Sequence, residues 1–251
     1  MLQTDEIGFG GLKLMQSEDA FRYGIDAVIL ADFASRGNAS CEKIIDLGTG
    51  NAIIPLILSH KIPGSHITGI EVQTAQADLA QKNVSLNCLE DRISIICSDV
   101  LDIDTGRMGK FGLVTCNPPY VKKGAGIMSG NKAKMTARHE TTAGLGDFLR
   151  VSSGLIDKDG EAVFVHRPHR LTEIFQRATE CGLSPAEMRM VCPYPGTNAN
   201  IVLVRFKKGR NKELTVLPEL HVRTKEGAYS DEILRIYEKN TKKQQIIEKN
   251  S

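Results

Sequence analysis

Short apolar runs alternate with longer stretches of mixed polarity through the middle of the chain. Runs of this length, rich in β-branched residues, are typical of strands that are buried on both faces of a sheet. Strands are predicted over 43–47, 66–71, 92–97, 111–116, 161–166, 187–192 and 200–206, with intervening helices over 53–59, 74–87, 145–156 and 171–180. Alternating strands and helices predict an α/β fold, a doubly wound, mostly parallel seven-stranded sheet. A short loop containing Pro193, Pro195 and Gly196 joins the last two strands and favours antiparallel pairing.

The two ends of the chain depart from this alternation. Asp26 precedes an apolar stretch that reaches Phe33, so it is predicted to cap a helix there, and residues 1–42 are expected to form a helical lead-in. One domain is predicted over 1–210, followed by a basic tail over 211–251 that contains a helix-like stretch over 230–239. The patternless stretch 117–144 is long for a loop in a compact domain, and such loops are usually functional or disordered.

Composition narrows the class of protein. The chain has 251 residues, 41% hydrophobic and 25% charged, which is ordinary for a globular protein. A net charge of +2 does not by itself indicate a nucleic-acid binder, so an RNA partner would require clustered basic residues.

Location and metal content are predicted from what the sequence lacks. The first residues do not resemble a signal peptide, no segment is long and apolar enough to span a membrane, and several cysteines lie in apolar runs, as in Ile95-Ile96-Cys97. These features predict a cytoplasmic protein. No set of Cys and His has the spacing of zinc ligands, so no metal is expected.

A glycine-rich turn follows the first of the central strands. Asp46-Leu47-Gly48-Thr49-Gly50 joins that strand to a helix, and the glycines let the backbone turn sharply and approach a ligand. Glu71 ends the next strand, at the spacing from which an acidic group reaches ribose hydroxyls. Asp99, after the third strand, can accept from an adenine amino group or simply cap a turn. Carboxylates without a phosphate-binding Lys fit an adenosine with a cationic sulfonium better than a dinucleotide.

The sequence Asn117-Pro118-Pro119-Tyr120 follows the fourth strand. An exocyclic amino nitrogen is a poor nucleophile because its lone pair is delocalised, and two acceptors at its hydrogens increase its reactivity. The Asn117 side-chain oxygen and the Pro118 carbonyl can be those acceptors, and the prolines add no competing N–H donor. Tyr120 offers a ring for stacking on a planar substrate. These residues therefore predict transfer of a group to an amino nitrogen.

These ordered motifs resemble those of class I S-adenosylmethionine (AdoMet)-dependent amino-methyltransferases. With Phe21-Arg-Tyr-Gly-Ile-Asp26, Ala137-Arg-His-Glu140 and His166-Arg-Pro-His-Arg170, the chain is most similar to the family that methylates adenine N6 at position 37 of valine tRNA. The resemblance covers about residues 9–206. One departure is Ala52, where the pattern often has a third glycine, and its methyl group is expected to be tolerated at some risk to helix packing.

The resemblance implies a role for each matching residue. Catalysis is expected at Asn117, Pro118 and Tyr120. The resemblance implies AdoMet contacts at Tyr23, Asp26, Asp46, Gly48, Gly50, Glu71, Asp99 and Asn117.

Two other classes of methyltransferase and one non-enzymatic RNA-binding module are alternatives to this function. Glutamine-N5 methyltransferases of proteins carry a substrate-binding domain before the cofactor turn, and only about 40 residues precede it here. A DNA methyltransferase would need a recognition insert, for which there is no room. An RNA-binding module with a vestigial cofactor pocket would not be expected to keep Asp46, Glu71 and Asn117.

Several other polar residues fit more than one role. A basic group after Tyr120 is interpreted either as a flap that contacts RNA phosphates or as a solvated loop. Its members are Lys122, Lys123, Lys132, Lys134 and Arg138. His139 and Glu140 are expected to position substrate or structure, because amino methylation needs no strong base. His166, Arg167 and His169 can line a substrate groove or cap a helix. The run 207–212 is interpreted as a solvated turn, with contact to RNA as the alternative.

Overall fold

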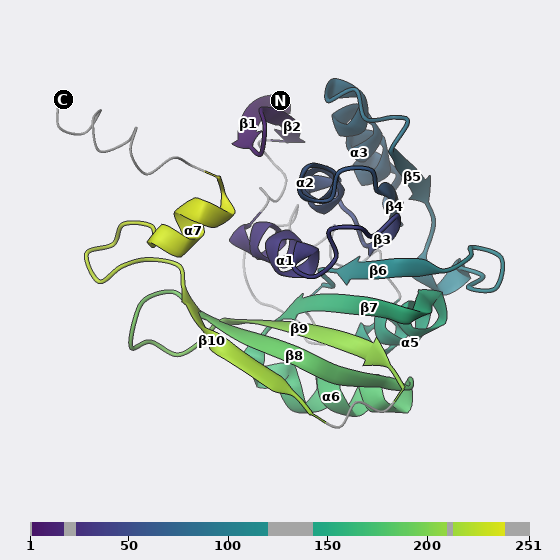
Figure 1. Ribbon diagram of the computed structural model, residues 1–251. Helices are drawn as coiled ribbons and strands as arrows, with labels where there is room; N and C mark the ends of the chain where they lie inside the picture. The colour runs from purple at the N-terminus through teal and green to yellow at the C-terminus, as the bar shows by residue number, and fades with distance from the viewer. Residues whose placement is uncertain (1, 18–23, 120–142, 210–212, 239–251) are drawn as a thin grey trace, which may run out of the picture.

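The computed structural model describes residues 2–17, 24–119, 143–209 and 213–238 (Figure 1). Its main sheet has eight strands in the order β10-β8-β9-β7-β6-β3-β4-β5. These strands are β3 (Lys43–Leu47), β4 (His66–Glu71), β5 (Ile93–Cys97), β6 (Phe111–Cys116), β7 (Ile156–His166), β8 (Leu183–Cys192), β9 (Ile201–Lys208) and β10 (Thr215–His221). Within this sheet β9 alone runs antiparallel to its neighbours. The prediction of a doubly wound, mostly parallel α/β sheet is therefore confirmed, with one strand more than expected.

Helices cover both faces of the sheet (Figure 1). One face carries α1 (Ile25–Ser35), α2 (Ile53–Lys61) and α3 (Thr74–Leu86), and the other carries α5 (Leu145–Leu155) and α6 (Leu171–Glu180). Two short 3-10 helices, η1 (Val100–Asp102) and η2 (Pro168–Arg170), follow strands β5 and β7. Strand residues alternate between the two cores: Ile44 packs into one and Ile45 into the other, and both are fully buried. No helix among these described segments is long and apolar enough to cross a membrane.

The N-terminal segment differs from the predicted helical lead-in. It begins with an antiparallel hairpin of β1 (Leu2–Gly8) and β2 (Leu12–Ser17), and α1 follows. The hairpin turn holds Gly8, Phe9, Gly10 and Gly11 at positive φ, a conformation that glycine adopts without steric cost. A turn of this composition between alternating apolar and polar residues is the signal that predicts a hairpin.

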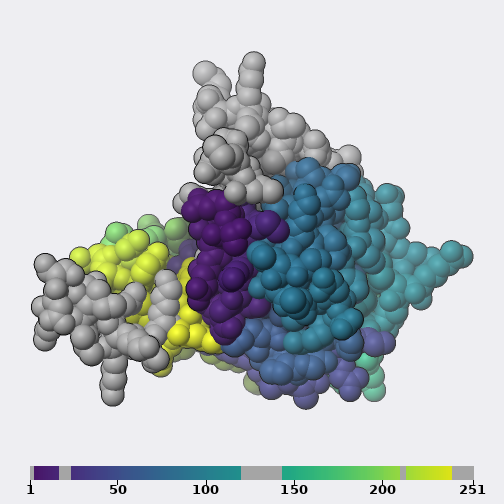
Figure 2. Space-filling model, turned by 90° about the horizontal axis from the view of Figure 1, so that it is seen from above, coloured from purple at the N-terminus to yellow at the C-terminus, as the bar shows by residue number. Residues whose placement is uncertain are grey.

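The hairpin is held against α3 by two asparagines. Asn83 accepts from the Met15 amide at 2.6 Å and donates to the Met15 carbonyl at 3.1 Å, and Asn87 makes the same pair of bonds with Lys13. These side chains occupy the backbone groups of β2 that would otherwise remain unpaired at a sheet edge. Figure 2 shows the hairpin, in purple, lying beside α3 in blue.

The segment predicted as a basic tail from residue 211 also differs. Its described part forms β10, which pairs parallel with β8, and α7 (Asp231–Ile236), capped by the Ser230 hydroxyl. Ile233 and Ile236 are buried in the core that also contains α1. Pro218 interrupts the apolar pattern of β10, and a proline is tolerated there because β10 lies at the edge of the sheet.

Candidate active site

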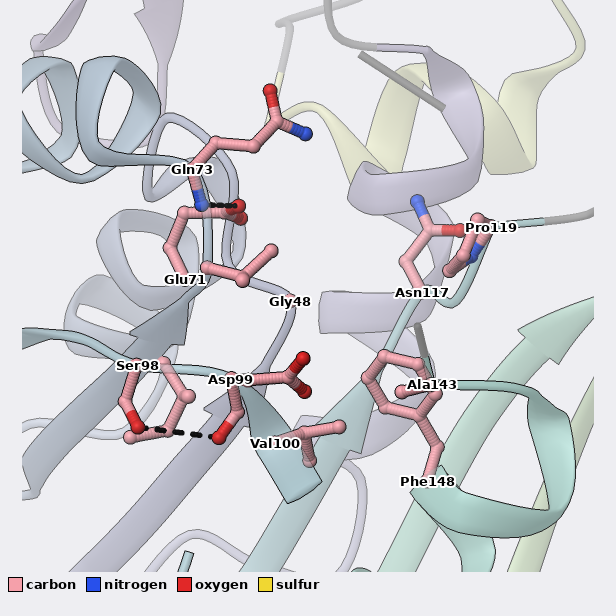
Figure 3. Close-up of a pocket in the computed structure, with 12 residues that line it drawn as sticks. Gly48, Glu71, Gln73, Ser98, Asp99, Val100, Asn117, Pro119, Ala143 and Phe148 are labelled. Carbon is pink, nitrogen blue, oxygen red and sulfur yellow. Dashed lines mark hydrogen bonds between the residues drawn. The ribbon is translucent and has the colours of Figure 1, made fainter. Parts of the chain in front are cut away.

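The strand order places a crevice beside β3. The chain runs outward from β3 through β4 to β5, then returns to form β6 on the other side of β3. Ligands of open α/β sheets bind at such a switch point, beyond the carboxyl ends of the strands. A pocket lies there, lined by residues from the ends of β4, β5 and β6 and from α5 (Figure 3). Its lining residues are Gly48, Ile70, Glu71, Val72, Gln73, Ser98, Asp99, Val100, Asn117, Pro119, Ala143 and Phe148.

The glycine turn contributes Gly48 to the lining of this pocket. The amides of Gly48 and Thr49 both donate to the Ile70 carbonyl at 2.9 Å, which ties the turn to β4. Gly48 and Gly50 have φ values of +73° and +56°, the left-handed region that favours glycine. A Cβ on Gly48 would stand 3.8 Å from the Phe148 ring. Both glycines are thus required by the backbone path.

Ala52 is also in the left-handed region, with φ +66°, at the N-cap of α2. Its side chain is fully buried, so the methyl group is accommodated. The departure from the glycine pattern therefore imposes a backbone cost, of order 1–2 kcal/mol for an L-residue in this conformation, rather than a loss of helix packing.

Glu71 organises the turn from the end of β4. Its Oε2 accepts from the Gly50 amide at 2.8 Å, its Oε1 accepts from the Gln73 amide at 2.9 Å, and its side chain is 5% exposed. A carboxylate has about four lone-pair sites. Glu71 also lines the pocket.

Asp99 shows both of the roles considered from the sequence. Its Oδ1 accepts from the Leu101 amide at 3.0 Å and caps η1. The residue also lines the pocket, and Figure 3 shows its carboxyl group pointing into it.

Asp46 lies beneath the turn instead of in the pocket lining. It is fully buried, and Thr115 donates to its Oδ1 at 2.6 Å. Burial raises the pKa of Asp46 to about 6, opposed by the threonine hydrogen bonds. In the structure, Asp46 thus supports the turn and β6 from below, and its predicted contact with AdoMet stays a prediction.

Asn117 and Pro119 line the pocket from the end of β6, across from Glu71 and Asp99 (Figure 3). Pro118 between them is buried. The end of β6 therefore brings the Asn117 amide side chain and Pro119 to the pocket side that faces the two carboxyl groups, whereas Pro118 is not among the lining residues and its predicted catalytic role stays a prediction.

Other predicted site residues lie elsewhere or outside the described part. Tyr23, Tyr120, His139, Glu140 and the basic group from Lys122 to Arg138 all fall in undescribed segments. Asp26 is in the first turn of α1, and its Oδ2 lies 3.6 Å from the Nη2 of Arg167. It does not cap the helix as predicted, because the N-cap is Gly24 and makes no side-chain bond.

Sequence reasoning missed several lining residues. Gln73 lies two positions after the end of β4, and Ser98 lies one position after the end of β5. Their positions just beyond predicted strands could therefore have identified them as lining residues. Phe148 and Ala143 reach the pocket from α5 and its approach, and only the packing of α5 beneath β6 brings them there.

His166 ends β7 and is 1% exposed. Its Nδ1 accepts from the Arg167 amide at 2.7 Å, and the Arg170 guanidinium lies 3.3 Å from its Nε2. Burial, followed by the charge of Arg170, lowers the pKa of His166 to about 4. A buried neutral histidine that organises η2 has a structural role, and it does not line the pocket.

This histidine predicts a pH dependence of stability. Below pH 6.5 the unfolded chain binds a proton at His166 that the folded chain does not bind until about pH 4, so the free energy of unfolding falls as pH falls through that window. The loss is at most about 3 kcal/mol. His166→Asn keeps an acceptor near Nδ1 and should remove this dependence, measured by urea unfolding from pH 4 to 7.

The comparison is the difference between wild type and variant, because Asp46, with its raised pKa, has the opposite sign over part of that range. His66→Asn, at an exposed position at the start of β4, is the matched control and should follow wild type. Parallel curves for wild type and His166→Asn would show that His166 does not titrate differently on folding.

The six cysteines differ in burial, and one of them lies close to a glutamate and a histidine. All six cysteines are free; Cys116 and Cys192 are buried, whereas Cys97 is exposed despite its apolar neighbours. Within the described segments one group has ligand atoms within 4.8 Å of one another: Cys192, Glu219 and His221. The pairing of β8 with β10 creates this group, so sequence spacing did not show it. It offers three ligands where structural zinc takes four, and Glu219 is exposed.

Comparisons with known proteins identify the family of this chain. Residues 26–170 match the family described as the methyltransferase small domain, more than half of the chain. A protein of Porphyromonas gingivalis named tRNA1(Val) (adenine(37)-N6)-methyltransferase is 26% identical over 94% of this chain and 95% of its own length. One of the same name from Aeromonas hydrophila is 27% identical, over 86% and 89%.

Solved structures show the same fold. A structure titled as a predicted O-methyltransferase from Agrobacterium tumefaciens has a TM-score of 0.65 at 22% identity, covering 85% of this chain and 96% of that one. The ribosomal protein L11 methylase of Lactobacillus delbrueckii has a TM-score of 0.54 at 16% identity, covering 75% and 81%. The matched segment contains β3 to β7 and all the described residues of the pocket lining, and the chain belongs to the methyltransferase small domain family.

Proposed function

We propose that this protein transfers a methyl group from AdoMet to the exocyclic N6 of an adenine in tRNA, the adenosine at position 37 of valine tRNA. The observation that carries the proposal is the position of Asn117 and Pro119 in the pocket lining, across from Glu71 and Asp99. The names of the full-length relatives support the choice of tRNA and of the adenine.

The pocket residues fit AdoMet. The described lining holds two carboxyl groups and neither Lys nor Arg, which favours a cationic, hydroxyl-bearing ligand over a phosphate. Glu71, already oriented by two backbone amides, would accept from ribose hydroxyls, and Asp99 from the adenine amino group. The glycine turn lets the ligand approach the backbone. When bound, AdoMet supplies an activated methyl group on a sulfonium sulfur.

The chain itself prepares the acceptor nitrogen. The Asn117 side-chain oxygen and the Pro118 carbonyl accept the two hydrogens of the target amine and draw it away from the plane of the ring. The same acceptors stabilise the positive charge that develops on the nitrogen. Preorganised groups of this kind are worth roughly 100- to 1000-fold in rate. No general base is required, because the proton leaves to water after transfer.

The assay is tritiated methyl transfer to separate pools of total tRNA, protein and DNA. We expect label in the tRNA pool, removed by ribonuclease. Label confined to protein and released by protease would instead indicate an amide nitrogen as the acceptor. Binding of AdoMet without transfer to any pool would contradict the enzymatic proposal.

A further inference from the structure

The edge of the sheet that holds the pocket continues well beyond it. The carboxyl ends of β6, β7, β8 and β10 all lie at this edge, together with the start of the antiparallel β9. Lys207 and Lys208, at the end of β9, lie at the opposite edge, and Lys207 pairs with Glu161 at 3.3 Å. These lysines therefore lie at the end of the sheet away from the pocket. The loops after β8 and β10 lie at the pocket's end and are better placed to contact RNA.

The loop after β8 is a rigid turn that exposes Tyr194. Residues 194–197 are closed by a bond from the Thr197 amide to the Tyr194 carbonyl at 3.2 Å, with Gly196 at φ +77° and Pro195 before it. The Thr197 hydroxyl donates to the same carbonyl at 2.7 Å and accepts from the Tyr194 amide. The Tyr194 backbone is thus fixed, yet the residue is 41% exposed.

The loop after β10 exposes a second tyrosine on a second turn. Arg223 and Tyr229 form an antiparallel bridge, and the Arg223 guanidinium lies 4.6 Å from the centre of the Tyr229 ring. Arg223 also donates to the Gly227 carbonyl at 2.6 Å, which fixes the guanidinium over the ring. Tyr229 is nevertheless 46% exposed, and Lys225 at the tip of the turn is exposed beside Glu226.

The two turns are adjacent. The Arg223 amide donates to the Pro193 carbonyl at 3.0 Å, and the Val222 amide donates to the Cys192 carbonyl at 2.9 Å. Figure 1 shows both loops together at the end of the sheet, one joining β8 to β9 and the other joining β10 to α7. Two exposed tyrosines, one of them with an arginine over its ring, therefore project from adjacent turns.

We propose that Tyr194, Arg223 and Tyr229, here called the stacking surface, bind unpaired bases of the RNA loop that carries the target adenine. This inference rests on the proposed function. Proteins bind unpaired bases by stacking them on exposed aromatic rings and on arginine planes. Adjacent strands are about 4.8 Å apart, so β8 and β10 lie roughly 14 and 19 Å from β6 along the sheet. A single nucleoside in the pocket cannot reach that far, whereas an RNA loop can.

The test compares two double variants. Tyr194→Ala with Tyr229→Ala should weaken binding of a valine tRNA transcript by at least about tenfold, the lower range expected for losing stacked bases. Tyr194→Phe with Tyr229→Phe keeps the rings and should stay within about threefold of wild type by the same reasoning. A trinucleotide centred on the target adenosine should bind the wild type and both variants equally, because it does not reach the surface. AdoMet affinity should not change.

Val216→Ala is the matched control, since Val216 is 61% exposed near the start of β10, at the opposite edge. Wild-type affinity of the alanine double variant for the transcript would overturn the stacking surface while leaving the proposed function standing. If the wild type transferred no label from AdoMet to tRNA, both the proposed function and the stacking surface would be overturned. Ultraviolet cross-linking of wild type to the transcript needs no substitution: adducts on peptides containing Tyr194 or Tyr229 support the inference, and adducts found only elsewhere contradict it.

Discussion

Asn117→Ala is expected to reduce the turnover of methyl transfer by at least roughly 100-fold, the usual effect of removing one preorganised acceptor or donor from an active site. Asn117 lines the pocket opposite Glu71 and Asp99, so we assign its oxygen to the substrate amine rather than to the cofactor. AdoMet affinity should therefore stay within a few-fold of wild type. Turnover is measured at saturating AdoMet and tRNA, and affinity by calorimetry.

Two further variants sharpen this prediction. Asn117→Asp keeps an oxygen at the same position and should lose less activity than Asn117→Ala. Asn198→Ala, an exposed asparagine outside the pocket, should retain wild-type turnover. Near-normal turnover of Asn117→Ala would exclude the assigned role, and a large loss of AdoMet affinity would show that Asn117 acts on the cofactor instead.

Glu71→Ala is expected to weaken AdoMet binding by about 1–3 kcal/mol, the cost of leaving buried donors unpaired. Two effects act together. The variant removes the acceptor proposed for the ribose hydroxyls, and it frees the Gly50 and Gln73 amides that the carboxylate now holds at 2.8 and 2.9 Å. The glycine turn should loosen as a result. Calorimetric titration of AdoMet measures the first effect, and amide hydrogen exchange at Gly50 measures the second.

Glu71→Gln separates the contributions, because its single amide oxygen can hold only one of the two amides well. Its affinity should fall between wild type and Glu71→Ala. Asp102 provides a charge control, because it is exposed and lies two positions after the lining residue Val100 without being in the lining itself. Asp102→Ala should bind AdoMet as wild type does. Unchanged affinity in Glu71→Ala would place the ribose elsewhere.

The central strands could be predicted closely from the sequence. β3, β4 and β6 have the expected bounds, because short, mostly apolar runs rich in β-branched residues are typical of strands buried on both faces of a sheet. The ends of the chain could not be predicted in the same way. The hairpin depends on four successive residues at positive φ, and β10 on an edge position that tolerates Pro218.

The candidate site was predictable as far as strand ends determine it. In parallel strands the residues after each carboxyl end meet at one edge, so Glu71, Asp99 and Asn117 share a pocket. Phe148 comes from α5, the next described element after β6, and no sequence spacing encodes its approach to the pocket. Asp46 has the predicted place in the sequence but is buried outside the pocket lining, because it accepts a hydrogen bond from Thr115, its register partner on the adjacent strand β6.

The most direct measurement is mass spectrometry of nucleosides from valine tRNA incubated with AdoMet and the protein. The proposed mechanism predicts one new modified nucleoside, N6-methyladenosine, formed by the wild type and absent with Asn117→Ala. Methylation at another nitrogen of adenine or on another base would contradict it, and so would the absence of methylation in both reactions.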